Sequence, residues 1–252
     1  MNSTALDPTL IADFDFIETK LPAIEGWLEP PAAQLTAFLL REQLSQAIAG
    51  PVLEIGVWRG KYLSVMFLCS VGKVIGVDIF QYGNTEAEIY ELFGSLFADS
   101  KDRLSLIRSS SQDLDGGQLR QAAGGNTYSF ISIDGGHTAT AVCNDLITCE
   151  SVLGPRGIIA IDDFLNPMTI GVSEGTYRYF LNSDNNLVPF AWCANKLFVC
   201  RRACAGKYAD MVLEFINKFP TIPVSKRFLE LRQNGDHWVN QDLLGGKCLI
   251  LG

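Results

Sequence analysis

Apolar runs that alternate with helical patterns from residue 51 onward constrain the fold of this 252-residue chain more than any other feature. The runs have the length and the continuous hydrophobicity of strands that are buried on both faces. They lie at residues 51–57, 73–80, 103–108, 128–133 and 157–162. The helical patterns between them lie at residues 61–71, 86–98, 112–123 and 138–153. This alternation predicts an α/β fold with a doubly wound, Rossmann-like, mostly parallel sheet and helices on both faces.

Two more apolar runs, residues 187–193 and 196–201, are separated only by Ala194 and Asn195. So short a connection predicts an antiparallel hairpin, although this turn pair is not a strong hairpin signal. With the five earlier runs, the hairpin makes a sheet of seven strands. A helix is predicted over residues 173–181, just before the hairpin.

Both ends of the chain lie outside the alternation. Residues 1–50 contain an amphipathic stretch at 33–49, and the prolines before it prevent a helix from entering from the N-terminal side, so we expect a helical cap or lid. Residues 51–201 form the predicted core. Residues 202–252 contain one predicted helix, at 209–218, and form an extension that packs on the core. No linker rich in Gly, Ser and Pro indicates a separate domain.

Composition limits the partners of the chain. Twenty basic and 28 acidic residues leave a net charge of −8, which argues against nucleic acid and anionic membranes as partners. The first residues lack the basic and apolar segments of a signal peptide, and no stretch approaches ~18 consecutive apolar residues. The seven cysteines form no Cys-x-x-Cys pair, as is typical of reduced core thiols. We therefore expect a soluble, cytoplasmic protein that binds a small molecule; a homo-oligomer is left open.

Carboxylates stand at the ends of two neighbouring strands. Asp134 follows the run at 128–133, and Asp162 and Asp163 end the run at 157–162. A helical stretch joins the two runs, so they form a parallel β-α-β unit whose strand ends share one edge of the sheet. Three carboxylates that converge there repel one another unless a cation or a proton offsets them. The pattern predicts a hard-metal site, with a solvated turn as the alternative.

The end of the first strand predicts a nucleoside site. The chain leaves this strand after Glu54 through Gly56 and Gly60, where missing side chains let a ligand or a helix approach the backbone. Trp58 stands where a dinucleotide fingerprint needs glycine. Asp78 ends the second strand 18 residues after Gly60, at the spacing of a ribose-binding acid. The alternatives are glycines needed only for the turn and an aspartate that caps the next segment.

These motifs resemble those of class I methyltransferases that use S-adenosylmethionine, specifically the metal-dependent O-methyltransferases. The Glu-x-Gly-x-x-x-Gly pattern at residues 54–60 is similar to their first motif, and Asp78 to their ribose-binding acid. Residues 109–114 resemble the Ala-Ser-Gln-Asp stretch of the catechol O-methyltransferases, in which Ser and Gln contact adenine. A role for Ser111 as a helix N-cap is compatible with this. The cofactor contacts that the resemblance implies are Glu54, Gly56, Trp58, Gly60, Asp78, Ser111, Gln112 and Asp134.

The acidic strand ends carry the resemblance further. The catechol O-methyltransferases bind magnesium with an Asp and an Asp-Asn pair, at the positions of Asp134, Asp162 and Asp163. The bacterial sugar O-methyltransferases of the macrocin type are more similar, with Asp-Gly-x-His and Asp-Asp in these places, and the resemblance covers residues 27–201. It implies that the three aspartates bind Mg²⁺ or another divalent cation. It also implies that His137 is the general base, a role that Asp134 can share; the alternative for His137 is local hydrogen bonding at a helix start.

The implied reaction moves a methyl group from a sulfonium to a hydroxyl oxygen. A divalent cation lowers the pKa of that hydroxyl, and a neutral imidazole removes its proton. The expected acceptor is a sugar or natural product, and a vicinal diol suits the metal best. Tyr62, Gly135 and Gly136 depart from the catechol O-methyltransferase pattern at the methionine and adenine contacts, and Asp163 adds a charge. The rival hypotheses are an NAD(P)-dependent oxidoreductase and a non-catalytic nucleoside-binding module.

Overall fold

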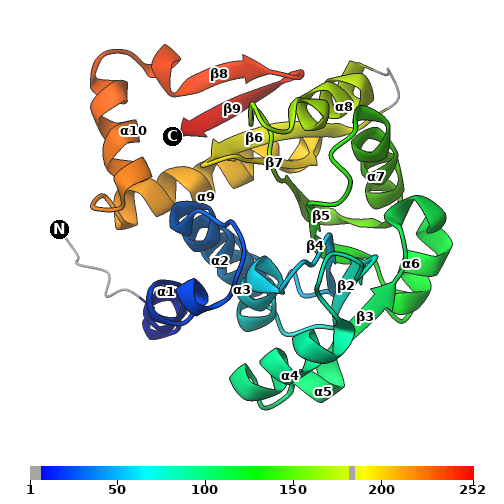
Figure 1. The fold of residues 1–252 in the computed structure, drawn as a ribbon. Coiled ribbons are helices and arrows are strands. Elements are labelled where there is room, and N and C mark those ends of the chain that lie inside the picture. Colours follow the sequence, from blue (N-terminus) through cyan, green and yellow to red (C-terminus); the bar gives the residue numbers. More distant parts are fainter. Residues whose placement is uncertain (1–6, 182–184) are drawn as a thin grey trace.

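A nine-stranded sheet runs through the computed structural model, which describes residues 7–181 and 185–252 (Figure 1). Its strand order is β3-β2-β1-β4-β5-β7-β6-β9-β8. The strands are β1 (Val52–Ile55), β2 (Val74–Asp78), β3 (Leu104–Arg108), β4 (Tyr128–Ile133), β5 (Leu153–Ile161), β6 (Leu187–Cys193), β7 (Lys196–Arg201), β8 (Asn240–Leu243) and β9 (Gly246–Leu251). The predicted α/β fold is confirmed, and so are all seven predicted strands.

The parallel part of the sheet is wound in two directions from β1. Val52 of β1 is in register with Val74 of β2 on one side and with Phe130 of β4 on the other. The chain passes from β1 through β2 to β3 and then returns to β4 and β5. Strand order therefore reverses between β1 and β4, and doubly wound sheets bind ligands beyond the carboxyl ends of the strands at such a point.

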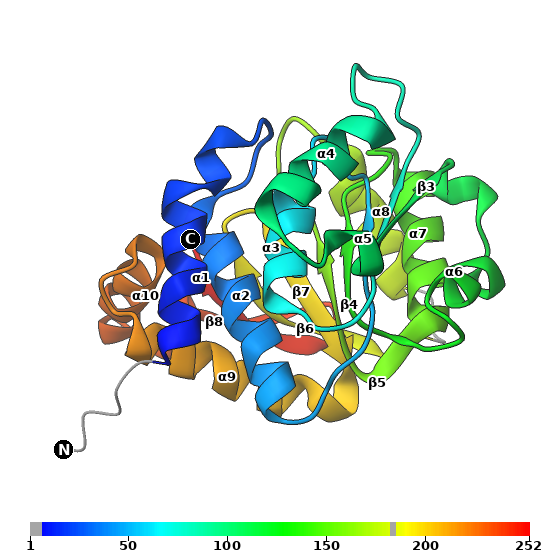
Figure 2. The same cartoon turned by 90° about the horizontal axis from the view of Figure 1, so that it is seen from below.

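Helices cover both faces of the sheet because neighbouring strand residues point to opposite sides. Val52 packs in one hydrophobic cluster and Leu53 in the other. The first cluster contains α1 (Pro8–Thr19), α2 (Pro30–Ser45), α3 (Lys61–Cys69), α4 (Glu86–Leu96), α9 (Ala205–Lys218) and α10 (Pro223–Gln233). The second contains α6 (Gly116–Ala122), α7 (Ala139–Val152) and α8 (Ile170–Leu181), and Figure 2 shows the two groups on opposite sides of the strands. The one-turn helix α5 (Ser100–Arg103) precedes β3.

Several helix predictions need correction at their boundaries: α8 and α9 begin three and four residues earlier than predicted, and two other corrections have a clear cause. Helix α2 begins at Pro30, because proline fits the first helical turn, where no backbone N–H is required. The single helix predicted over residues 112–123 is two helices, a 3-10 turn at Ser111–Asp113 and then α6. The separation occurs because Asp115 caps α6 by accepting a hydrogen bond from the Gln118 N–H, while the Gln118 side chain bonds back to the Asp115 backbone.

The N-terminal helices pack as part of the described core. The guanidinium of Arg41 in α2 donates to both carboxylate oxygens of Asp13 in α1, at 2.7 and 2.8 Å. The same guanidinium donates to the carbonyl of Leu68 in α3. Residues 1–6 of the expected cap lie outside the described part. Helix α1 was not predicted.

The C-terminal extension continues the sheet instead of only packing on it. Strand β9 pairs parallel with β6, and β8 pairs antiparallel with β9. The predicted count of seven strands is therefore two short. Strand β9 is stabilised by pairing with β6, 58 positions earlier in the chain, and β8 is stabilised by pairing with β9. A local pattern does not report the distant partner of β9. Helix α10, which packs against α9, was also missed.

Two further observations concern the cysteines and the lengths of the helices in the described residues. All seven cysteines are free, and five of them are buried. The helices that the structure describes are too short or too polar for one to extend across a bilayer.

Candidate functional site

A cavity of about 1040 Å³ opens at the carboxyl ends of the parallel strands, where strand order reverses. Its wall combines the loops after β1 to β5 with residues 26–29 and 194–196. Gly60 is the only predicted site residue that does not line it. The predicted residues that do line it are Glu54, Gly56, Trp58, Asp78, Ser111, Gln112, Asp134, His137, Asp162 and Asp163.

Gly56 lets the ends of β1 and β4 touch. It has a φ of +85°, and a Cβ atom at this position would lie 1.8 Å from the carbonyl oxygen of Asp134. The Asp134 N–H donates to the carbonyl of Ile55 at 2.8 Å. Only glycine permits this contact, which places Asp134 beside the turn that follows β1. Gly60, with a φ of +80°, begins α3 and faces Ile89 and Phe93 of α4.

Asp78 holds the turn after β1 through its side chain. One carboxylate oxygen accepts hydrogen bonds from the Val57 and Trp58 N–H groups, each at 2.9 Å. The other oxygen accepts from the Phe80 N–H at 2.6 Å. The capping alternative is therefore part of the structure. A carboxylate has about four lone-pair directions, so these three bonds leave capacity toward the cavity, and ribose binding stays a prediction.

At the other end of the cavity, the side chain of Gln112 is held by α7. Its amide nitrogen donates to Asp145 at 2.8 Å, and its carbonyl oxygen accepts from Asn144 at 3.0 Å. Asp145 is buried, its second carboxylate oxygen has no hydrogen-bond partner, and burial raises its pKa to about 6. Sequence reasoning missed Asp145 because no strand end or turn marks it. The expected adenine contact at this loop is left to Ser111 and the backbone unless Gln112 changes partners.

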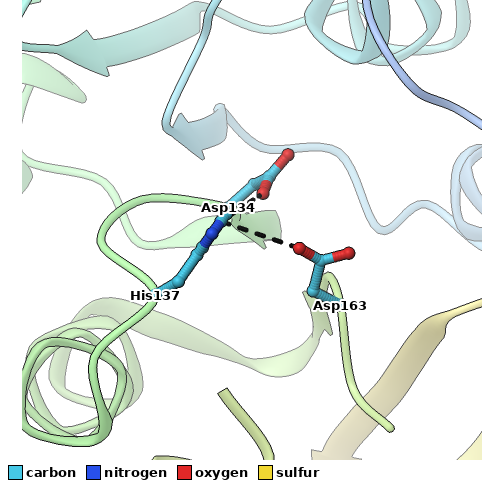
Figure 3. A group of neighbouring side chains, drawn as sticks. All are labelled: Asp134, His137 and Asp163. Atoms are coloured by element: carbon cyan, nitrogen blue, oxygen red, sulfur yellow. Dashed lines mark ion pairs between the residues drawn. The ribbon is translucent and has the colours of Figure 1, made fainter. Parts of the chain in front are cut away.

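Asp134, His137 and Asp163 form a cluster on the wall of the cavity. The His137 imidazole lies between the two carboxylates, with its Nε2 atom 3.6 Å from Asp134 and 3.7 Å from Asp163 (Figure 3). Asp163 has a left-handed φ of +59° and accepts hydrogen bonds from the amides of Asn166 (2.8 Å) and Asn195 (2.7 Å). These bonds fix the side chain that follows the end of β5.

Asp162 is directed to a second, buried cluster. One of its carboxylate oxygens lies 2.5 Å from the Lys196 ammonium, and the other accepts from the Asp163 N–H. Lys196 is 2% exposed, and its ammonium lies 4.2 Å from the centre of the Tyr62 ring. Glu54 is also buried here, and one of its oxygens has no partner. Sequence reasoning missed Lys196 as a site residue, although a lysine at the start of an otherwise apolar strand is a usable signal.

The pKa values reflect these neighbours. Burial, and then the charge of Asp162, raises the pKa of Asp134, while the nearby Asp134 carboxylate raises the pKa of His137. Burial also raises the pKa of Asp163, but hydrogen bonds from asparagine amides outweigh it and lower the pKa. Burial lowers the pKa of Lys196, and the charges of Asp162 and Asp134 more than offset this. The charge states of Asp134, His137, Asp163 and Lys196 therefore depend on the charged and polar groups around them.

The cluster of Asp134, His137 and Asp163, called the outer cluster from here on, fits a divalent cation. Ligand atoms of Asp134, His137 and Asp163 all lie within 4.8 Å of one another. Two carboxylates leave positions open for water and substrate, and the imidazole beside them can act either as a ligand or as a base. Asp162 is not in this group, although it neighbours Asp134. The structure therefore brings Asp134 next to each of the other two aspartates, with Asp162 held by Lys196.

Comparisons with known proteins agree with this geometry. Residues 53–164 match the family described as a methyltransferase domain, and no curated protein matches the chain. Similar solved structures include the O-methyltransferase NovP (TM-score 0.58, 13% identity, 76% of this chain and 97% of that one). Another is CalS11, the TDP-rhamnose 3'-O-methyltransferase of calicheamicin biosynthesis (TM-score 0.52, 15% identity, 77% of this chain and 93% of that one). A third is MycE of mycinamycin biosynthesis, in complex with Mg and S-adenosylhomocysteine (SAH) (TM-score 0.52, 20% identity, 75% of this chain and 54% of that one).

Identities this low show a shared fold alone. The family match is independent of them, and its span includes the glycine turn after β1 and all three strand-end aspartates. The resemblance to class I methyltransferases is thereby confirmed. Together, the match over residues 53–164 and the fold support a class I, S-adenosylmethionine-dependent methyltransferase domain in the core of this chain.

Proposed function

We propose that this methyltransferase acts on a hydroxyl oxygen of a small molecule and that a divalent cation assists it. The observation that carries the proposal is the outer cluster, in which Asp134, His137 and Asp163 place three ligand atoms within 4.8 Å on the cavity wall. Methyl transfer to oxygen needs activation of the hydroxyl, and this donor set suits that purpose. The named activities of NovP and CalS11, and the Mg in the MycE complex, support the proposal.

Asp134 and Asp163 supply carboxylate oxygens to the proposed cation. Asp162 is the third predicted ligand: its oxygen that accepts from the Asp163 N–H keeps a lone pair for a cation, while Lys196 holds the other oxygen. When bound, a cation such as Mg²⁺ lowers the pKa of a hydroxyl and fixes its direction. His137 is the proposed base: in this role it is not a ligand of the cation, and it accepts the proton at Nε2. Its raised pKa favours the protonated form, and positive charge between the carboxylates opposes that effect.

The methyl donor is proposed to lie along the side of the cavity built by β1, β2 and β3. The turn at Gly56 gives close access to the backbone, Asp78 faces the ribose, and Ser111 and Gln112 border the adenine. The acceptor then enters from the side of residues 26–29 and 166–169. The free cysteines also lead us to propose a reducing, cytoplasmic setting.

Metal binding can be tested without knowing the acceptor. We expect isothermal titration of the SAH-loaded protein with Mg²⁺ to show one site, which Asp163→Asn weakens at least tenfold. His137→Gln is expected to keep SAH affinity and to lose methyl transfer to a catechol probe. The matched control is Asp242→Asn, which changes an exposed carboxylate on β8. A protein that binds SAH but no Mg²⁺, and methylates at the same rate after chelation, refutes the cation role.

A further inference from the structure

Apolar side chains that are open to solvent gather at the mouth of the cavity. Trp27 is 92% exposed, Met168 is 87% exposed and Tyr82 is 70% exposed, and all three line the cavity. They come from three separate loops, before α2, between β2 and α4, and between β5 and α8. A group of exposed apolar side chains around a pocket marks a surface that a ligand or a partner covers.

The backbone at Met168 and beside Trp27 is held in place relative to the outer cluster. The Met168 N–H donates to the side-chain oxygen of Asn166 at 2.9 Å, and the amide of Asn166 donates to Asp163. On the other side, the ammonium of Lys61 in α3 donates to the carbonyl of Gly26, next to Trp27. Leu165 and Ile170, close to Met168 in the sequence, are exposed as well. An acceptor at Asp163 therefore reaches this surface directly.

The charges at the mouth are unsuited to an anionic acceptor. The loops at residues 25–29, 80–85 and 165–170 contain no lysine or arginine, and their only charged side chains are Glu25 and Glu29. Glu25 faces Arg59, whose guanidinium also pairs with Glu88. The cations that line the described cavity each have a partner: Lys61 donates to the Gly26 carbonyl, Lys196 pairs with Asp162, and His137 lies beside Asp134 and Asp163. A diphosphate that extends along these loops meets Glu25 and Glu29 and finds no lysine or arginine in them, which costs affinity.

Building on the function proposed above, we propose that the acceptor is uncharged and carries an apolar ring next to its hydroxyl-bearing ring. The apolar ring packs between Trp27 and Met168, while the hydroxyl lies at Asp163 and His137. A large flat side chain such as Trp27 gives much contact area at a low entropic cost. The charges at the mouth disfavour nucleoside-diphosphate sugars such as the TDP-rhamnose that the name of CalS11 records.

Two probes that share one sugar test the proposal. Titration calorimetry with SAH and Mg²⁺ present compares 4-nitrophenyl α-L-rhamnoside, which is neutral and has an aromatic ring, with TDP-rhamnose. We expect the aryl glycoside to bind at least tenfold more tightly, and Met168→Lys to narrow that gap by strengthening TDP-rhamnose binding. Equal or tighter binding of TDP-rhamnose by the wild-type protein overturns the proposal, and so does binding of neither probe while SAH binds.

Single variants then locate the apolar contact. Trp27→Ala is expected to weaken the aryl glycoside roughly tenfold or more, the scale of an interface anchor, with unchanged SAH affinity and melting temperature. Trp238→Ala is the matched control, because Trp238 is also exposed but lies in the C-terminal extension. If the two variants behave alike, or if Trp27→Ala changes only the sedimentation mass, the surface does not bind the acceptor. A protein that binds SAH but no Mg²⁺ rejects the cation role, independently of these results.

Discussion

Replacing Lys196 by methionine tests whether a buried ammonium stabilises the acidic interior of the site. The ammonium is 2.5 Å from Asp162, the residue is 2% exposed, and Glu54 and Asp134 contribute to its environment. Methionine keeps most of the volume and removes the charge. Removing one partner of a buried ion pair costs about 3–5 kcal/mol, because the remaining charge has no counter-charge.

We expect a correspondingly large fall in melting temperature. In a chain of this size, 1 kcal/mol shifts the midpoint by about 2–4 °C, so the Lys196→Met variant should melt roughly 6–20 °C lower. Thermal and urea unfolding of the metal-free protein measure this. Lys247→Met is the matched control: its pair with Asp242 spans 2.8 Å, but the two side chains are 66% and 83% exposed, and we expect no measurable change.

A double variant separates lost charge from lost packing. Asp162→Asn in the Lys196→Met background removes the charge left without a partner, so we expect it to recover a large part of the lost stability. Added Mg²⁺ should raise the melting temperature of Lys196→Met, since a bound cation restores positive charge near Asp134. If Lys196→Met melts like wild type and like Lys247→Met, the buried pair does not stabilise the site and the reasoning fails.

Three further predictions concern other parts of the site. Gly56→Ala should lose SAH binding and unfold at much lower urea concentration, because its Cβ overlaps the Asp134 carbonyl. The control Gly94→Ala in α4, with open space at its Cβ, should instead stabilise the protein by about 0.5–1 kcal/mol. Equal urea midpoints for the two variants would contradict this. Asp145 has a pKa of about 6 against an ordinary 3.8, so the folded state binds the proton more tightly and wild-type stability falls as the pH rises from about 4 to 6. Asp145→Asn should abolish this fall and be more stable than wild type above pH 6 by about 3 kcal/mol. If urea unfolding shows a stability difference between variant and wild type that does not vary with pH, the prediction is wrong. The same Asp145→Asn variant should weaken SAH binding in calorimetry, because Asp145 no longer holds the Gln112 loop as a charged acceptor; unchanged affinity would show that this loop needs no such support.

The core of this fold could be predicted because its signals are local. Strand runs that end in Asp78, Asp134 and Asp162 state both the element and the edge of the sheet where it ends, and the β-α-β rule then brings those ends together. The spacing of Gly56 and Gly60 likewise located the turn after β1. These features depend on neighbours in the sequence, so a single chain was enough to place ten of the site residues around one cavity.

What the sequence did not reveal depends on distant partners. Lys196 pairs with Asp162 across 34 positions, and Asp145 holds Gln112 from 33 positions away. Hydrophobic periodicity does not report which polar side chain faces another. The direction of Asp162, toward a lysine and away from the outer cluster, follows from this missed pairing. Strand β9 was missed for the same reason, since its partner β6 is distant in the sequence, and β8 was missed with it because β8 pairs with β9.

The pairing of β9 with β6 also changes what the molecule presents at the rim of its sheet. Without the last strands, the main-chain groups of β6, a strand of almost wholly buried side chains, would be open to another chain. The outermost position instead belongs to β8, whose side chains include Asn240, Gln241 and Asp242. A short polar border of this kind discourages fibre-like stacking between copies. The C-terminal strands thus protect this edge of the sheet from pairing with a strand of another molecule.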